Sequence, residues 1–215
     1  MSDSRSSNCK SNSRASLSLV VRACVSMMIL TGSLLQVQST TALTQTRDQL
    51  FRLERALAQV AKEERVHAVN DYFNQMAFQS DYSVWGEDDY WATPEEFLQM
   101  EAGDCEDFSM AKYFMLRRLG VDEGQMKLAY VRVEPKGEAH MVLAYYPDNT
   151  NDPKILDNLT GDIVRLSERS DLLPTYSFNA ENIWIGLPSA AESGVGNARQ
   201  LSRWQSWLAR VDLVE

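Results

Sequence analysis

Cys105 is the residue of this chain with the clearest capacity for covalent chemistry. It lies in the stretch EAGDCEDFS, residues 101–109, between Asp104 and Glu106. A cysteine attacks a carbonyl group as its thiolate, and neighbouring carboxylates oppose formation of that anion. A helix that begins at this point would offset the effect, because its free backbone N–H groups and dipole stabilise a thiolate. The same N–H groups can bind the oxyanion that forms during acyl transfer.

Catalysis by a cysteine also needs a histidine that takes the thiol proton and a polar group that orients the imidazole. The chain has two histidines, His67 and His140. We interpret His67, inside a predicted helix, as a surface or packing residue. His140 begins a predicted strand 35 residues after Cys105, and Asp157 follows 17 residues later in the next strand. If these strands are antiparallel neighbours packed on the Cys105 helix, the three side chains can converge.

Three acids adjoin the cysteine and allow two interpretations. Asp104 can serve as a helix N-cap, with Glu106 and Asp107 in the first turn, where the helix dipole favours acids without any metal. Clustered carboxylates are also ligands for Ca²⁺, and a bound cation would reverse the sign of the electrostatic field at the thiol. The residues alone leave both interpretations open.

The elements that must position these residues follow from the spacing of apolar side chains. Helical periodicity predicts helices at residues 43–76 (one helix or two in succession), 93–103, 104–120 and 198–211. Apolar runs separated by turns predict strands at residues 126–134, 140–146, 154–166 (turning near Thr160–Gly161) and 182–187. The aromatic and polar stretch 77–92 lacks clear periodicity and is predicted to be a loop. Helices first and strands second indicate an α+β fold with an antiparallel sheet.

Two of these helices have recognisable ends. Thr93 and Pro94 form a helix-start pair, and we expect Gly103 to end that helix. Asp104 is expected to begin the next helix, which ends at Gly120 after two arginines. One face of this second helix is predicted to be buried, and it consists of Phe108, Ala111, Met115 and Leu119.

The first 42 residues differ in composition from the rest. They contain four basic residues against one acid, then the apolar run 23–37, and they end on Thr40-Thr41-Ala42. A basic start, a short apolar run and small residues predict a secretory signal peptide at residues 1–42. The run is shorter than the roughly 20 residues that a spanning helix needs. An uncleaved N-terminal anchor is the alternative. Residues 43–215 are then expected to form one exported domain that does not span a membrane.

Removal of the signal peptide changes the charge and the cysteine count. The remaining chain has 17 basic and 29 acidic residues, a net charge of about −12. Nucleic acid is therefore not expected as a partner, because binding to phosphates needs a basic surface. Cys9 and Cys24 leave with the signal peptide, so Cys105 is the only cysteine left. An exported chain with one cysteine has no internal disulfide, and its free thiol is a candidate for reactivity.

Three stretches carry a resemblance to a known family: DDYWATPEEFLQMEAGDCEDFSMAKYFMLRRLG (88–120), AHMVLAYY (139–146) and ILDNL (155–159). In this order they resemble the bacterial transglutaminase-like cysteine proteinases, whose best-known members are the LapG-type periplasmic proteases. The likeness extends from about residue 45 to residue 187. It implies a papain/transglutaminase-like α+β fold, with the nucleophile at a helix N-terminus packed on an antiparallel sheet. It also implies Cys105 as nucleophile, His140 as general base and acid, and Asp157 as the group that orients His140.

The resemblance further implies a metal, a substrate and a partner. LapG-type enzymes are calcium-dependent, which implicates Asp104 and Glu106, with Asp107 a weaker candidate, as ligands of Ca²⁺. The implied function is a periplasmic cysteine endopeptidase that cleaves the N-terminal region of a large LapA-like surface adhesin, releasing it and dispersing biofilm. A LapD-type inner-membrane receptor for cyclic-di-GMP is the implied partner. Two other classes stay open: a transglutaminase that passes the acyl group to an amine, and a non-enzymatic calcium-binding adaptor that does not need the thiol.

Overall fold

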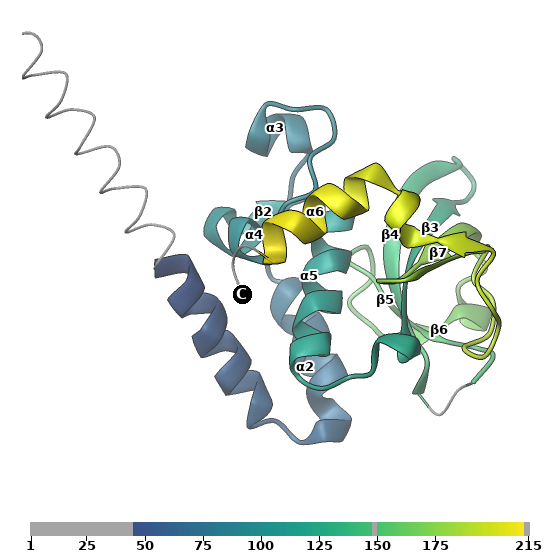
Figure 1. Ribbon diagram of the computed structural model, residues 1–215, viewed down its shortest axis with the longest axis horizontal. Helices are drawn as coiled ribbons and strands as arrows, with labels where there is room; N and C mark the ends of the chain where they lie inside the picture. The colour runs from purple at the N-terminus through teal and green to yellow at the C-terminus, as the bar shows by residue number, and fades with distance from the viewer. Residues whose placement is uncertain (1–44, 148–149, 213–215) are drawn as a thin grey trace, which may run out of the picture. The chain divides into compact units, whose positions relative to one another are not determined.

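The computed structural model describes residues 45–147 and 150–212. The predicted signal peptide, residues 1–42, lies outside the described residues. The chain divides into two units, and the second, Thr46–Glu215, contains every element labelled in Figure 1. Among the described residues, none of the helices is long and apolar enough to cross a membrane.

Helices occupy most of the N-terminal part of the described chain. Residues 45–58 are helical, and η1 (Lys62–Glu64) and α2 (Arg65–Phe73) follow, so two helices in succession are confirmed. The predicted loop 77–92 is wrong in part, because it contains β1 (Ala77–Phe78) and α3 (Asp81–Trp85). The remaining α-helices are α4 (Pro94–Met100), α5 (Cys105–Arg118) and, near the C-terminus, α6 (Ser202–Asp212). The predicted helix 198–211 thus begins later, after the 3₁₀ turn η5 (Ala198–Gln200).

A seven-stranded antiparallel sheet forms the other layer, in the order β6-β5-β4-β3-β7-β8-β9. Its strands are β3 (Met126–Val133), β4 (Glu138–Tyr145), β5 (Lys154–Leu156), β6 (Val164–Arg165), β7 (Leu172–Phe178), β8 (Asn182–Ile185) and β9 (Gly196–Asn197). The four predicted strand regions are confirmed, including the turn between β5 and β6. Sequence analysis missed β7, which pairs with β3 near the middle of the sheet. Pro174 interrupts its pattern, and the register with β3 shifts at that point.

The main core lies between α5 and the sheet. Ten of the fourteen residues of α5 are buried, including the predicted apolar positions Phe108, Ala111 and Met115. In Figure 1, α5 runs between α2 and the sheet, and α6 crosses beside it. Trp204 and Trp207 of α6 stack at 5.0 Å between ring centroids, and both are buried. Burial of this much apolar and aromatic surface is the principal source of stability for α5.

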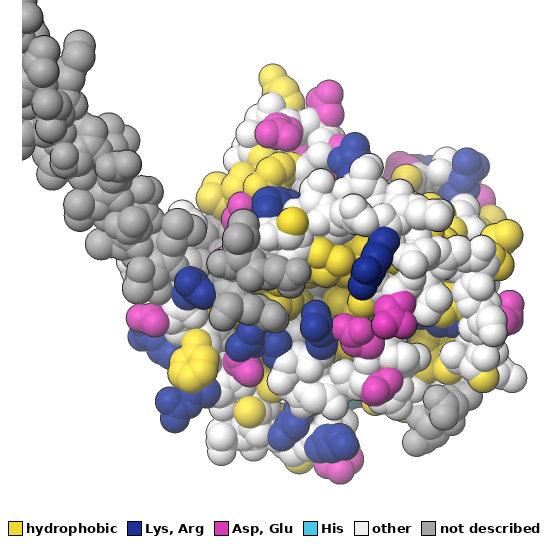
Figure 2. Space-filling view, viewed as in Figure 1, with side chains coloured by type: hydrophobic (Ala, Val, Ile, Leu, Met, Phe, Trp, Pro, Cys, Tyr) yellow, Lys and Arg dark blue, Asp and Glu magenta, His cyan; other side chains and the backbone are white. Residues whose placement is uncertain are grey.

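Surface charges of both signs are mixed on the face of the molecule drawn in Figure 2. Acidic side chains lie between lysines and arginines there, with small apolar areas in between. A continuous basic surface is not seen on that face among the described residues.

The junction between α4 and α5 positions Cys105. Thr93 caps α4 with a reciprocal capping box, as its sequence predicts. The helix ends at Met100, and Glu101 rather than Gly103 takes the left-handed conformation, with φ of 50°. The expectation that Gly103 ends the helix is therefore wrong. Gly103 instead lies in β2 (Ala102–Gly103), which pairs in parallel with β1. A Cβ atom at Gly103 would lie 2.3 Å from Asp107 Oδ2.

This close approach predicts that Gly103→Ala destabilises the protein. The added methyl group must push aside Asp107, a buried side chain that holds the start of α5, so we expect a loss of about 1–3 kcal/mol in the free energy of unfolding. Gly161→Ala is the matched control, since a Cβ atom there meets nothing within 4 Å. Chemical denaturation of the two variants measures the difference. Equal stabilities would contradict a packing role for Gly103.

Candidate active site

Cys105 is the first residue of α5, with Asp104 at the N-cap position as predicted. The side chain is partly buried, and its thiol donates a hydrogen bond to Glu106 Oε2 at 3.1 Å. The backbone of Met141, the residue after His140, lowers the pKa of the thiol, but this is the smallest of the effects on it. Burial first, and then the negative charge of Glu106, raise the pKa of the Cys105 thiol. The immediate surroundings of the thiol therefore favour its protonated form.

A hydrogen bond fixes this end of α5 against β4. Ser109, one turn after the cysteine, donates from Oγ to the carbonyl oxygen of Met141 at 2.9 Å. Both Ser109 and Met141 are buried. The structure therefore brings the cysteine to the strand that carries His140, as the order of elements predicted.

His140 and Asp157 form a buried pair. His140 Nε2 lies 2.8 Å from Asp157 Oδ1, and the two side chains are 6% and 0% exposed. Because the carboxylate occupies Nε2, Nδ1 is the ring nitrogen that remains to accept a thiol proton. His67 is exposed on α2, so its interpretation as a surface residue is confirmed.

Asp157 is held as an anion. Burial alone would raise its pKa, but the hydrogen bond and charge of His140, the Leu159 N–H group and Arg169 outweigh that effect and lower the pKa to about 2. Arg169 Nη1 lies 2.8 Å from Asp157 Oδ2, and the arginine side chain is 7% exposed. Sequence analysis did not identify Arg169, because an arginine in a polar stretch has no spacing that marks it.

The acids around Cys105 divide into two kinds. Asp107 is 1% exposed and has both oxygens engaged by backbone groups: Oδ1 accepts from Ala92 N at 2.8 Å and Oδ2 from Asp104 N at 3.3 Å. It thus performs the structural task that the capping interpretation predicted. Asp104 Oδ1, in contrast, is buried with no hydrogen-bond partner.

Two further acids approach this cluster from the segment before α4. Oxygens of Asp81, Asp104 and Asp107 lie within 4.8 Å of one another, and the same holds for Asp81, Asp89 and Glu106. Asp81 is 2% exposed, and its Oδ1 has no hydrogen-bond partner, whereas Oδ2 accepts from Tyr90 N at 2.6 Å. Sequence analysis missed Asp81 and Asp89, because residues 77–92 were interpreted as a loop without periodicity.

The carboxylates of this cluster have too little positive charge around them to stabilise their ionised forms. Burial, followed by repulsion from Glu106, raises the pKa of Asp104 to about 8. Burial also raises the pKa of Asp107 to about 8, with Asp104 and Asp81 adding repulsion. The pKa values of Glu106 and Asp81 are raised as well, again mainly by burial. The oxygen-only donors and the two free buried oxygens fit a hard divalent cation such as Ca²⁺.

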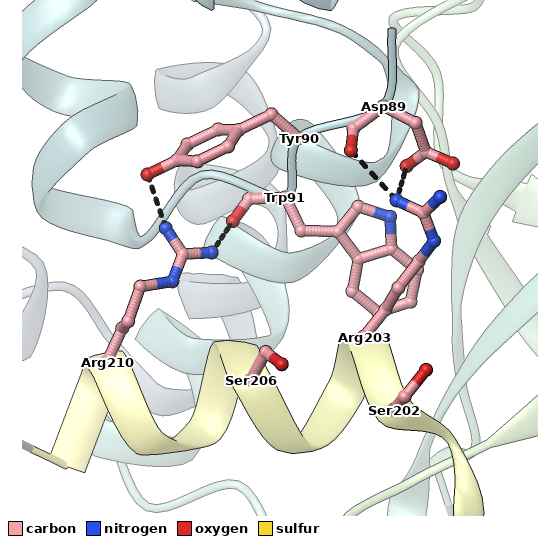
Figure 3. Close-up of a pocket in the computed structure, with 7 residues that line it drawn as sticks. All are labelled: Asp89, Tyr90, Trp91, Ser202, Arg203, Ser206 and Arg210. Atoms are coloured by element: carbon pink, nitrogen blue, oxygen red, sulfur yellow. Dashed lines mark hydrogen bonds and ion pairs between the residues drawn. The ribbon is translucent and has the colours of Figure 1, made fainter. Parts of the chain in front are cut away.

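Helix α6 fixes the segment that carries Asp89 (Figure 3). Arg203 Nη1 contacts Asp89 Oδ1 at 2.5 Å and also donates to the Asp89 carbonyl oxygen at 2.8 Å. Two turns further along the same face of α6, Arg210 donates to the Tyr90 hydroxyl and the Trp91 carbonyl oxygen. Asp89 therefore already has a cationic partner, which distinguishes it from Asp81 and Asp104.

Known proteins match both the sequence and the fold. Residues 41–190 match the family of bacterial transglutaminase-like cysteine proteinases, BTLCP. The EGTA-treated structure of Legionella pneumophila LapG is 32% identical with a TM-score of 0.67, covering 80% of this chain and 97% of that one. The calcium-bound structure of the same protein is 36% identical with a TM-score of 0.64, covering 76% of this chain and 87% of that one. Curated protein sequences give no match. The predicted transglutaminase-like α+β fold is confirmed.

The raised pKa values of Asp104 and Asp107 predict how stability depends on pH when a chelator is present. Between about pH 4 and pH 8 the folded protein keeps protons on these groups that the unfolded chain releases near pH 3.8. The stability that these two groups contribute is therefore fully present below about pH 4, and it is lost as the pH rises from there through 8. We expect the melting temperature to fall from pH 5 to pH 9, and to fall less in Asp104→Asn.

Thermal melts at several pH values measure this dependence. Glu138→Gln, a change at an exposed acid on β4, is the control and is expected to follow the unmodified protein. A melting temperature that stays constant across this range in chelator, or an Asp104→Asn profile as steep as that of the control, would contradict the assignment.

Proposed function

The chain belongs to the bacterial transglutaminase-like cysteine proteinases, and from this membership we propose that it is a calcium-dependent periplasmic cysteine endopeptidase. The observation that carries the proposal is the arrangement of Cys105 at the start of α5, which Ser109 bonds to the backbone of Met141 beside His140, with His140 paired to the buried Asp157. This arrangement supports the assignment of Cys105 as nucleophile, His140 as base and Asp157 as orienting anion.

In the proposed reaction His140 Nδ1 takes the proton of Cys105, and the sulfur attacks the carbonyl carbon of a peptide bond. Backbone N–H groups at the start of α5 stabilise the oxyanion. The C–N bond breaks as His140 returns the proton to the leaving amine, which leaves an acyl-enzyme. A water molecule, deprotonated by the same histidine, then hydrolyses the thioester. Asp157 keeps the imidazole oriented and stabilises its cationic form throughout.

The calcium part of the proposal concerns Asp81, Asp104 and Glu106. Bound there, Ca²⁺ would supply positive charge that offsets the carboxylates beside the thiol. Asp81 and Asp104 offer the free buried oxygens, and Glu106 is the acid that accepts the thiol proton in a hydrogen bond. Asp107 supports the site through the backbone and stays a weaker candidate ligand. The calcium-bound form of the Legionella relative supports the same ion here.

The proposed substrate and partner follow from the family resemblance. The substrate is the N-terminal region of a large LapA-like surface adhesin, and cleavage releases the adhesin and disperses biofilm. A LapD-type inner-membrane receptor for cyclic-di-GMP would sequester the protease in the periplasm. Export through cleavage of residues 1–42 is part of this proposal.

Replacement of the nucleophile tests the enzymatic proposal. Cys105→Ala is expected to lower cleavage of a recombinant adhesin N-terminal segment by about a thousandfold or more, because no other group can form the acyl-enzyme. Peptide fragments are measured by electrophoresis and mass spectrometry. The variant must retain calcium binding and its melting temperature, which excludes unfolding as the cause.

Two results would overturn this assignment. Processing that survives in Cys105→Ala would leave the calcium-binding adaptor as the better function. Incorporation of a labelled amine by the unmodified protein, without release of peptide, would instead favour the transglutaminase class.

Calcium binding is tested separately from activity. We expect Asp81→Asn to weaken the affinity for Ca²⁺ about tenfold or more in isothermal titration calorimetry, since one charged ligand is lost. Asp162→Asn, an exposed acid in the turn between β5 and β6, is the matched control and should bind as the unmodified protein does. Equal affinities for the Asp81→Asn and Asp162→Asn variants would remove Asp81 from the site.

A further inference from the structure

Asp157 has a partner on each of its two oxygens. Oδ1 accepts from His140 Nε2 at 2.8 Å and from Leu159 N at 3.0 Å, while Oδ2 accepts from Arg169 Nη1 at 2.8 Å. The side chain itself is fully buried. A carboxylate bonded on one oxygen only can rotate about its Cβ–Cγ bond. The Arg169 contact therefore fixes the plane of the carboxylate, and with it the direction in which Oδ1 meets the imidazole.

Arg169 is itself held in place. Its Nε and Nη2 atoms bind the two carboxylate oxygens of Asp171 at 2.9 and 2.8 Å, and Nη1 also lies 3.3 Å from Thr160 Oγ1. The backbone around it is folded back, because Arg169 N donates to Leu166 O and Leu172 N donates to Arg169 O. Because Nε and Nη2 bind Asp171, the plane of the guanidinium is fixed and the N–H groups of Nη1 point away from Asp171. Asp171 thus aims Arg169 at Asp157.

Charge reinforces the geometry. Arg169 approaches Asp157 from the segment before β7, His140 from β4, and Lys112, whose charge also acts on Asp157, from α5. Lys112 is fully buried, and its Nζ has no hydrogen-bond partner. Arg169 is the cation in direct contact with the carboxylate. An ionised Asp157 can only accept hydrogen bonds, so the proton between Oδ1 and His140 belongs to Nε2.

We propose that Arg169 is a positioning residue for the His140–Asp157 pair, which it serves by fixing the Asp157 carboxylate through Oδ2. Its effect is to hold His140 in the tautomer that carries hydrogen on Nε2 and leaves Nδ1 bare for the Cys105 proton. This inference rests on the proposed function, because it takes His140 as the base of the reaction. The competing role is purely structural: an ion pair that ties the loop after β5 to the start of β7.

Nitrogen NMR of the imidazole rings separates the two roles. The chain has two histidines, and exposed His67 serves as an internal reference, so ¹⁵N-histidine labelling reports His140 directly. In the calcium-loaded protein we expect His140 to show at least about a ten-to-one excess of the Nε2–H tautomer. Arg169→Met is expected to bring the two tautomers to comparable populations. Arg169→Lys keeps the positive charge but loses the bidentate contact, and Asp171→Asn weakens the contact that orients Arg169. In both variants the ratio of the two tautomers should lie between those of the unmodified protein and of Arg169→Met.

Kinetics give the second readout. Arg169→Met is expected to lower kcat for the adhesin segment about tenfold to a hundredfold, with KM changed less than twofold, because the base is misplaced while substrate contacts remain. Arg165→Met is the control, since Arg165 is the exposed last residue of β6, four residues before Arg169, and its side chain donates to the carbonyl oxygen of Asp152. It should change neither quantity.

The decisive result is the tautomer of His140 in a folded variant. If Arg169→Met keeps the single Nε2–H tautomer, the positioning role is wrong and the arginine is a structural ion pair only. If that variant fails to fold, Arg169→Lys and Asp171→Asn decide the question by the same measurement. The tautomer does not depend on any substrate, so absence of proteolysis in the unmodified protein would overturn the proposed function without touching this readout.

Discussion

The packing of the first two turns of α5 on β4 is the contact on which the site depends. The carbonyl oxygen of Met141 accepts the hydrogen bond of Ser109 Oγ, so one residue of the strand fixes the start of the helix against the sheet. Since His140 precedes Met141, the same contact brings the backbone of His140 close to the first turns of α5. The buried residues of α5 and the stacked tryptophans of α6 belong to one hydrophobic core, which stabilises this contact. A shift of either element would separate the thiol from the histidine proposed as its base.

The two sides of the thiol differ in how their charges are compensated. On the histidine side, Asp157 is matched by His140 and Arg169 and is strongly stabilised as an anion. On the other side, Asp81, Asp104 and Glu106 are desolvated beside one another, and two of their oxygens lack any donor. Transfer of the thiol proton to His140 leaves a negative sulfur next to these acids. That step is favourable only where added positive charge offsets the carboxylates, which links the proposed chemistry of Cys105 to a cation.

The parts of the site that lie within one element could be predicted from the sequence. Asp104 as the N-cap, Cys105 as the first helical residue, and the position of His140 in a strand follow from local patterns that the structure reproduces. Asp157 was predicted to lie within a strand, but it lies directly after β5. Asp81 and Arg169 could not be predicted in this way. Asp81 begins the short helix α3 in a stretch that was predicted to be a loop, and Arg169 lies in the segment before β7. Each reaches the site through contacts between distant parts of the chain. Strand β7 was missed for a related reason, because Pro174 breaks its pattern and only pairing with β3 explains the bulge.

Buried carboxylates without donors would be a fault in a region that only had to be stable, because each costs free energy that packing elsewhere must offset. Here they occur where several independent features converge. Gly103 leaves room for Asp107, Asp107 organises the backbone of Ala92 and Asp104, and α6 fixes the segment that carries Asp89. Such precise support for an unfavourable charge arrangement is expected where function requires it and is not expected of a solvated acidic loop. These observations favour the proposed role of the acids beside Cys105 as ligands of a cation over that of a solvated acidic loop.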